Sequence, residues 1–261
     1  MRKTVGWRFQ EMSRLYHFTS FDSACKIIKS GKLRFSKAWR LNDLIESNRV
    51  VGERTISERL LVNRPYLLNA EAEMRKYQQI SFAQDRECNG MEYLGFDLHS
   101  MWGLYADKGY GVCLVFDKDK LKLSVGDYAS NVSYANFIPQ GVIIKNKSLP
   151  GIKSEIWTKK DEIYFYKRKE WEHEQEYRII RRAKKESDTE YLDVSDSLSF
   201  VIICKCDSVC LLESMFDSVI YQELHHLNKK LPIFTYECGL DGYTLYEEWM
   251  VPVWSEQCGY M

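Results

Sequence analysis

The sequence predicts an α+β protein that folds as a single domain, and three observations lead to that expectation. The 261 residues are 45% hydrophobic and 14% aromatic, which is enough apolar material for one sizeable core. Short segments rich in β-branched and aromatic residues recur between amphipathic segments, as is typical of mixed α and β folds. No Pro/Gly/Ser-rich or charged linker divides the chain, so we expect one domain over residues 1–261.

The first predicted elements are a strand, a helix and a second strand. Leu15–Thr19 has the apolar and aromatic content of a strand, and Ser20 can cap a helix over Phe21–Lys29. Apolar residues recur in that helix every three or four positions, so one of its faces should turn toward the core. Gly31 should end the helix, and Leu33–Ser36 should form the next strand.

The middle of the chain is predicted to alternate between helices and strands. Residues 53–79 are rich in Glu, Arg, Leu and Ala, and should form two helices separated at Pro65. Ile80–Ala83 should be a strand, His99–Ala106 a short helix, and Gly111–Phe116 a buried strand introduced by glycine.

The C-terminal part is predicted to add further helices and strands. The charged stretch Glu155–Trp171 should be a helix, and an amphipathic helix over Met215–Lys229 should stop before Pro232. The expected strands share β-branched and aromatic residues, and they are Glu176–Ile180, Phe200–Cys204, Ile233–Glu237 and Thr244–Tyr246. We expect residues 190–250 to complete the same domain.

Charge and cysteine usage limit the partners and the compartment. Lys and Arg together number 37, as do Asp and Glu, so no net field favours nucleic acid or an anionic membrane. No apolar run approaches the roughly 18 residues of a membrane helix, and the N-terminus lacks the apolar stretch of a secretion signal. The eight cysteines are scattered, which favours reduced thiols. We therefore expect a cytoplasmic protein that has no membrane partner.

A metal site is not predicted. Cys204, Cys206 and Cys210, together with His225 and His226, supply the atoms that zinc prefers, but paired Cys-x-x-Cys motifs are absent. Cys204 lies in an apolar stretch, where a free cysteine packs as a small apolar side chain. We therefore interpret these residues as structural.

Three polar side chains fall at the ends or junctions of predicted elements. His17 lies on the first strand, Tyr105 precedes the glycine-led strand, and Glu176 starts a later strand. Binding and catalytic residues are commonly placed at such positions. Each residue also has a structural interpretation, as a satisfied histidine, a core tyrosine, or a carboxylate paired with a nearby arginine. Both interpretations remain open.

Short motifs give the chain a resemblance to a bacterial family of unknown function, family 2971. Tyr16-His17-Phe18-Thr19-Ser20 is similar to the Tyr-His-Tyr-Thr-Ser start of that family. The other matching motifs are Leu33-Arg34-Phe35-Ser36, Asn42-Asp43 with Glu46, Ser81-Phe82, Met101 to Asp107, Gly111-Val112 and Trp171 to Arg178. The resemblance covers most of residues 14–182, and it implies no particular reaction.

A second resemblance, to the His-Tyr-Glu class of ADP-ribosyltransferases, does imply a reaction. It is carried by His17-x-Thr19, by Tyr105 before a glycine-led strand, and by Glu176 at the start of a strand. Glu174-Gln175-Glu176 is also similar to the Glu-x-Glu element of the arginine-specific class. The resemblance implies split antiparallel sheets with peripheral helices, and NAD as the substrate that donates ADP-ribose.

The same resemblance implies a role for each matching residue. His17 would hydrogen-bond a ribose hydroxyl of NAD, while Tyr105, with Trp102, would stack on the flat, electron-poor nicotinamide. Glu176 would hold the ribose 2′-hydroxyl and stabilise the oxocarbenium-like charge that develops as the glycosidic bond breaks. The implied catalytic residues are His17, Tyr105 and Glu176, and the implied cofactor-binding residues are His17, Thr19, Arg34, Ser81, Trp102 and Tyr105.

The resulting hypothesis is an NAD-dependent ADP-ribosyltransferase that modifies a macromolecule, as a bacterial toxin or antiphage defence effector with an antitoxin among its partners. Basic residues on both sides of Glu176, at 167–169 and 178–185, slightly favour RNA or DNA over protein as the acceptor. The simpler interpretation of these basic residues is a solvated charged face that is balanced by neighbouring acids. Two alternatives are kept: an inert module of the same fold that binds a nucleotide or a protein, and an NAD glycohydrolase.

Overall fold

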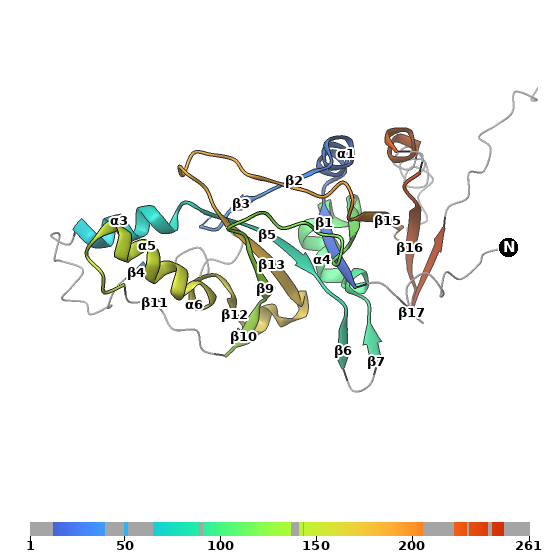
Figure 1. Ribbon diagram of the computed structural model, residues 1–261. Helices are drawn as coiled ribbons and strands as arrows, with labels where there is room; N and C mark the ends of the chain where they lie inside the picture. Colours follow the sequence, from blue (N-terminus) through green and yellow to red (C-terminus); the bar gives the residue numbers. More distant parts are fainter. Residues whose placement is uncertain are drawn as a thin grey trace, which may run out of the picture.

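The computed structural model describes residues 13–39, 50–51, 65–88, 91–136, 141–142, 144–205, 222–228, 230–239 and 242–247. The described residues form a central nine-stranded sheet in the order β17-β16-β15-β8-β1-β5-β13-β9, with β3 beside β5 (Figure 1). Its strands are β1 (Arg14–Thr19), β3 (Ser36–Lys37), β5 (Tyr77–Ala83), β8 (Val112–Asp117), β9 (Tyr128–Asn131), β13 (Glu176–Arg182), β15 (Leu198–Lys205), β16 (Ile233–Gly239) and β17 (Gly242–Glu247). The prediction of a mixed α+β protein is confirmed.

The sheet opens between two of its central strands. β1 pairs with β8 along its whole length, from Arg14 opposite Asp117 to Thr19 opposite Val112. In contrast, β1 pairs with β5 only where Tyr16 lies opposite Ala83. The strands from β17 to β1 and those from β5 to β9 are therefore joined across a single residue pair.

Pairing in the sheet is antiparallel except between β15 and β16, which are parallel. The expectation of antiparallel sheets is wrong at this pair. A parallel pair needs a crossover that returns the chain to the same end of the sheet, and such crossovers usually contain a helix. Residues 222–227, in the connection between these two strands, are helical.

The first strand and helix form as their sequence predicts. Ser20 begins α1 (Phe21–Ser30), because its Oγ accepts a hydrogen bond from the backbone N–H of Ser23 at 3.3 Å. Gly31 ends the helix in the left-handed conformation, with φ of 66°, which favours glycine. These two caps fix where the chain leaves β1 and where it turns back.

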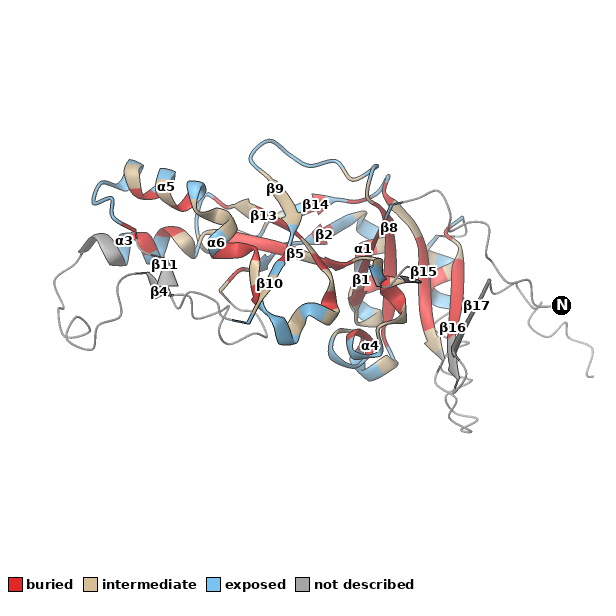
Figure 2. Cartoon of the chain, turned by 90° about the horizontal axis from the view of Figure 1, so that it is seen from below, coloured by how far each residue is buried: buried red, intermediate tan, exposed pale blue. Residues whose placement is uncertain are grey.

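Helices cover both faces of the sheet around β1 and β8. α1 buries Ala24 and Ile27 in one cluster, while α4 (His99–Tyr105) buries Met101 and Trp102 in another. Alternate residues of β8 belong to these two clusters, so the two helices lie on opposite faces. Figure 2 shows the strands between them as almost continuously buried.

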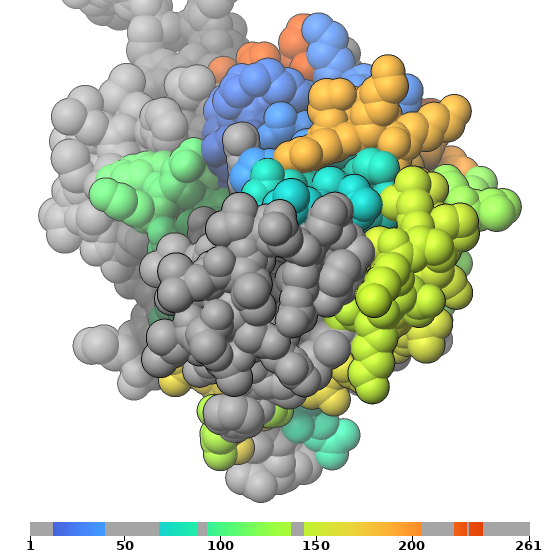
Figure 3. Space-filling view, turned by 90° about the vertical axis from the view of Figure 1, so that its left-hand side faces the viewer, coloured from blue at the N-terminus to red at the C-terminus, as the bar shows by residue number. Residues whose placement is uncertain are grey.

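A third apolar cluster covers the other half of the sheet. It is formed by α3 (Pro65–Met74), α5 (Leu149–Thr158) and α6 (Lys160–Tyr164), together with side chains of β5 and β13. Tyr77 of β5 stacks on Tyr164, with ring centroids 4.9 Å apart. Figure 3 views the molecule from this end, with α5 (yellow-green) on the surface.

Shorter strands pair outside the central sheet. These pairs are β2 (Lys32–Arg34) with β14 (Tyr191–Asp193), β4 (Val50–Val51) with β11 (Gly141–Val142), β6 (Arg86–Cys88) with β7 (Met91–Tyr93), and β10 (Ser133–Ala135) with β12 (Tyr166–Arg168). The short 3₁₀ helices are η2 (Gly95–Asp97), η3 (Asp107–Gly109) and η4 (Lys169–Glu174). In Figure 3 the segment that carries β14 (orange) lies beside the N-terminal segment (blue), as the β2–β14 pairing requires.

Most predicted elements within the described ranges are confirmed. They are the strands expected at 15–19, 80–83, 111–116, 176–180, 200–204, 233–237 and 244–246, and the helices expected at 21–29 and 99–106. The strand expected at Leu33–Ser36 is interrupted at Phe35, which is buried between β2 and β3. No helix in the described part of the chain is long and apolar enough to cross a membrane.

Two predicted helices are partly wrong. Residues 77–79 belong to β5, and the helix expected over Glu155–Trp171 is replaced by α5, α6, β12 and η4. Tyr164 and Phe165 are buried in the third apolar cluster, so tertiary packing overrides the local helix preference of this charged stretch. Residues 53–64 and 215–221, which complete two other predicted helices, lie outside the described residues.

The position of Leu114 at the centre of β8 gives a test of the core. Leu114 is 0% exposed, so Leu114→Ala should lower the free energy of unfolding by about 2–5 kcal/mol, because it leaves a cavity. Leu123→Ala is the control, since Leu123 is 43% exposed and the change should stay within about 0.5 kcal/mol. Urea unfolding measures both, and equal effects would contradict the described core.

Candidate active site

A cavity of about 290 Å³ lies where β1 and β5 separate. Its walls come from β1, β5, the β2–β3 segment, α4, and the stretch from β12 to the start of β13. The walls are therefore built from parts of the chain that are far apart in sequence. Residues from all of these parts meet only because the sheet opens at this place.

The structure brings together five of the residues that the sequence singled out. His17, Tyr105 and Glu176 line the same cavity, and so do Arg34 and Ser81. These residues come from β1, α4, β13, β2 and β5. The cavity therefore contains the three polar side chains proposed as catalytic, together with Arg34 and Ser81 from the set proposed to bind the cofactor.

Thr19 and Trp102 are not among the residues that line the cavity. Trp102 is buried, its Nε1–H donates to the carbonyl of Phe96 at 2.7 Å, and its ring stacks on Tyr236 at 5.8 Å. It lies on the sheet-facing side of α4, three residues before Tyr105. The structure thus places Trp102 in the apolar core and not among the residues that line the cavity.

His17 bridges the gap between β1 and β5. Its Nδ1 lies 3.1 Å from the carbonyl oxygen of Ser81, so Nδ1–H is the donor. Burial lowers the pKa of His17 from its ordinary value of 6.5, although the Ser81 carbonyl partly offsets this effect. The ring is therefore neutral at pH 7, and no described residue hydrogen-bonds its Nε2.

Tyr105 presents its ring to the cavity from the last position of α4. Its hydroxyl donates to Oε1 of Glu174 at 2.8 Å. The end of α4 approaches β1 closely at Gly111, where an added Cβ would lie in contact with the carbonyl of Thr19 and 2.8 Å from the backbone of Ala106. Glycine at this point therefore lets the helix end pack directly against β1.

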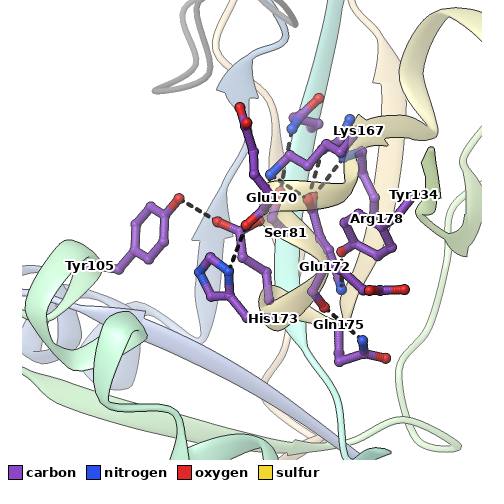
Figure 4. Close-up of polar contacts among 12 residues, drawn as sticks. Ser81, Tyr105, Tyr134, Lys167, Glu170, Glu172, His173, Gln175 and Arg178 are labelled. Atoms are coloured by element: carbon purple, nitrogen blue, oxygen red, sulfur yellow. Dashed lines mark hydrogen bonds and ion pairs between the residues drawn. The ribbon is translucent and has the colours of Figure 1, made fainter. Parts of the chain in front are cut away.

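Glu174 and Glu176 form a buried ion cluster with Lys167 and Arg178. Arg178 binds Glu176 through two of its three nitrogens, with Nε 2.7 Å from Oε1 and Nη2 2.8 Å from Oε2. Lys167 Nζ lies 2.8 Å from Oε2 of Glu176 and 2.6 Å from Oε2 of Glu174. The four residues are at most 7% exposed, and their formal charges cancel. Figure 4 shows Tyr105, Lys167 and Arg178 with dashed lines for their polar contacts in this region.

The charges around Glu176 keep its carboxylate ionised. Burial alone would raise the pKa of Glu176, but Arg178 and Lys167 lower it to about 2. Glu176 therefore stays ionised at physiological pH. Such a group stabilises positive charge at contact distance, but it is a poor general base.

The backbone turns sharply between the two carboxylates. Gln175 has φ of 45°, in the left-handed region that costs a non-glycine residue about 1–3 kcal/mol. Its carbonyl accepts a hydrogen bond from the backbone N–H of Gln84 at 3.1 Å. The N–H of Glu176 donates to the hydroxyl of Tyr134 at 2.8 Å. This turn directs Glu174 and Glu176 to the same cation, Lys167.

Sequence reasoning missed several residues of the site. In the sequence, Lys167 and Arg178 belong to the two basic groups on either side of Glu176, whereas both residues are buried in the cluster. The position of Arg178 could have been found, because residues two apart on a strand lie on the same face as each other. Gln79, which also lines the cavity, carries no comparable signal in the sequence, and Trp171 is noted there only as the start of a family motif.

The cysteines with described side chains do not line the cavity. In the described ranges Cys25 and Cys113 are free thiols, and Cys204 packs against the apolar cluster around α4. No group of three His, Cys, Asp or Glu side chains within these ranges is arranged to hold a metal ion. Cys206 and Cys210 lie outside the described residues.

Comparison with protein families links this site to a known sequence pattern. Residues 101–179 match the model of a family described as protein of unknown function (DUF2971). The resemblance to that family is confirmed over this segment, which holds Tyr105, Glu176 and the whole ion cluster. No curated protein and no solved structure matches the chain.

Lys167→Met tests the ion cluster. At pH 7 the substitution should lower the free energy of unfolding by about 3–5 kcal/mol, because the buried Glu174 then loses its cation and the buried Glu176 keeps only Arg178. Loss of Lys167 raises the folded-state pKa of Glu176, so the difference in free energy of unfolding between the variant and the wild type should narrow as the pH falls. Urea unfolding at pH 7 and at acid pH measures both effects.

Lys122→Met is the matched control for this substitution. Lys122 forms an ion pair with Asp196 at 2.6 Å, but both side chains are exposed, so its removal should have no measurable effect. An effect of Lys167→Met as small as that of the control would show that the buried cluster does not stabilise the fold.

Proposed function

We propose that the chain is an NAD-dependent ADP-ribosyltransferase that transfers ADP-ribose to a macromolecular acceptor. The observation that carries the proposal is that His17, Tyr105 and Glu176, from three separate elements, line one cavity. The opening of the sheet between β1 and β5 supports the split, ADP-ribosyltransferase-like form of the fold.

Each of the three side chains suits one part of such a reaction. The ring of Tyr105 offers a face on which the cationic nicotinamide can stack. The neutral His17 has Nε2 available to accept a hydrogen bond from a ribose hydroxyl. The ionised Glu176 can stabilise the positive charge that develops on the ribose as its bond to nicotinamide breaks.

The ion cluster leaves room for a ribose hydroxyl on Glu176. A carboxylate has roughly four lone-pair sites, and the contacts with Arg178 and Lys167 occupy one on Oε1 and two on Oε2. Oε1 therefore keeps one acceptor site. A hydroxyl donor that approaches from the cavity does not need to break the arginine bridge.

RNA or DNA stays slightly favoured over protein as the proposed acceptor, but on fewer residues than the sequence suggested. Arg178 is buried, Arg181 binds Asp127, and Arg182 binds Glu73. Lys184 and Lys185, just beyond β13, are exposed and support an anionic acceptor. A role as a toxin or antiphage effector, with an antitoxin partner, belongs to the same proposal.

One observation favours an inert module that binds a nucleotide or a protein. The charges of the ion cluster cancel, and a neutral, fully paired cluster is equally suited to a structural role. The two functions are separated by incubating the purified protein with labelled NAD and with RNA, DNA or cell lysate. Transfer of label supports the transferase, nicotinamide release without transfer supports a glycohydrolase, and binding without release supports the inert module.

Tyr105 provides variants that separate stacking from hydrogen bonding. Tyr105→Ala should lower kcat/KM for nicotinamide release at least about tenfold, because it removes the ring on which the pyridinium stacks. Tyr105→Phe keeps the ring but lacks the hydroxyl that donates to Glu174, so its kcat/KM should fall less. Nicotinamide release measures the rates, and thermal unfolding checks that both variants fold.

Tyr191→Ala is the control for the Tyr105 variants, since Tyr191 is 50% exposed and does not line the cavity. It should leave the rate unchanged. A Tyr105→Ala variant that folds and releases nicotinamide at the wild-type rate would remove Tyr105 from the proposed reaction.

A further inference from the structure

Gln79 has an unpaired amide atom beside the cavity. The side chain lies in the middle of β5 and is only 2% exposed. Its Nε2 lies 3.3 Å from Oγ of Ser81, a long contact, while Oε1 is buried without a hydrogen-bond partner among the described residues. A buried acceptor left unpaired costs about 1–3 kcal/mol, so a ligand that donates a hydrogen bond there would be bound favourably.

The amide is directed toward the cavity and can turn. Ser81, the residue that it contacts, lines the cavity and lies on the same face of β5 as Gln79. The terminal torsion of glutamine is soft, so the amide can rotate away from Ser81 without leaving its rotamer. Both amide atoms can then be offered to one ligand.

Two further polar side chains lie at this end of the cavity. Ser36 lies opposite Gln79 in the pairing of β3 with β5, and it lines the cavity. Arg34 is exposed at the rim, and no described residue forms an ion pair or hydrogen bond with its guanidinium. An unpaired arginine and a hydroxyl at a cavity rim suit the phosphate of a nucleotide.

The two ends of the cavity are separated by about the length of a nucleotide. Ala83, four residues along β5 from Gln79, lies opposite Glu176. At about 3.3 Å per residue the two positions are about 13 Å apart. One ligand can therefore reach the ion cluster with one part and Gln79 with another.

We propose that the Gln79 end of the cavity is an adenine subsite. A glutamine amide recognises adenine by accepting from the N6 amino group and donating to N7. This pairing satisfies Oε1 and replaces the long contact between Nε2 and Ser81. Arg34 and Ser36 then bind the adjoining phosphate. The subsite rests on the proposed function for NAD as the natural ligand, but adenine recognition can be tested without that reaction.

The pairing predicts discrimination between adenine and hypoxanthine. Hypoxanthine carries an oxygen in place of the amino group, so it presents two acceptors where adenine presents a donor and an acceptor. Wild-type protein should therefore bind AMP about tenfold or more tightly than IMP, and isothermal titration calorimetry measures both affinities. No measurable AMP binding, or equal affinity for the two nucleotides, would overturn the proposal.

Gln79→Met should abolish this discrimination by weakening AMP binding and leaving IMP binding nearly unchanged. The variant should fold, because it removes the unpaired acceptor and keeps the side-chain length. Gln84→Met is the matched control, since Gln84 follows β5 and does not line the cavity. This variant should keep the wild-type ratio of AMP affinity to IMP affinity. A folded Gln79→Met protein that still prefers AMP as strongly as wild type would refute the role of Gln79.

Arg34→Met separates the phosphate from the base. It should lower the affinities for AMP and for IMP by the same factor and leave the ratio of the two affinities unchanged. A changed ratio would contradict the assignment of Arg34 to the phosphate.

The outcomes also distinguish this proposal from the transferase. If the wild-type protein releases nicotinamide but does not discriminate between AMP and IMP, only the adenine subsite is overturned. If it discriminates between them but does not release nicotinamide, only the transferase is overturned.

Discussion

The buried ion cluster of Glu174, Glu176, Lys167 and Arg178 determines the inner wall of the cavity. Its charges cancel among buried side chains, so loss of any one member leaves a buried charge without compensation. β12, η4 and β13 must therefore stay together, and α4 joins them through the hydroxyl of Tyr105. The cluster thus holds in place the elements that carry the proposed site. It also holds two side chains of that site, Tyr105 and Glu176.

The opening of the sheet between β1 and β5 needs its own compensation. Backbone groups that lose a strand partner must find another. Across this gap the carbonyl of Ser81 accepts a hydrogen bond from the ring of His17 instead of from a backbone N–H of β1. Nearby, Asp85 accepts from the hydroxyl of Tyr16 and the N–H of Gly95. The structural interpretation of His17 therefore holds for Nδ1, while Nε2 remains suited to a ligand. One side chain can serve both roles because its two nitrogens face different partners.

The sequence allowed the local elements to be predicted better than the contacts between them. Ser20 and Gly31 signal the ends of α1, and the apolar run after Gly111 signals β8, because these features act over a few residues. The opening of the sheet and the left-handed conformation of Gln175 arise from tertiary packing, which leaves no short pattern. The error over Glu155–Trp171 also hid Lys167, since a residue placed on an exposed helix is not expected in a buried cluster.

The low pKa of Glu176 distinguishes between kinds of glycosidic chemistry. Hydrolysis of an ordinary glycoside needs a carboxylic acid with a raised pKa, because the leaving oxygen must be protonated. A pKa of about 2 excludes Glu176 from that role. When the bond between ribose and nicotinamide breaks, the electron pair of the C–N bond passes to the cationic pyridinium nitrogen, and nicotinamide leaves as a neutral molecule without a proton. Only the ribose then carries new positive charge. Because the ion cluster is neutral as a whole, its carboxylate acts mainly at contact distance, so the proposed reaction requires that the ribose reach Oε1 of Glu176 directly.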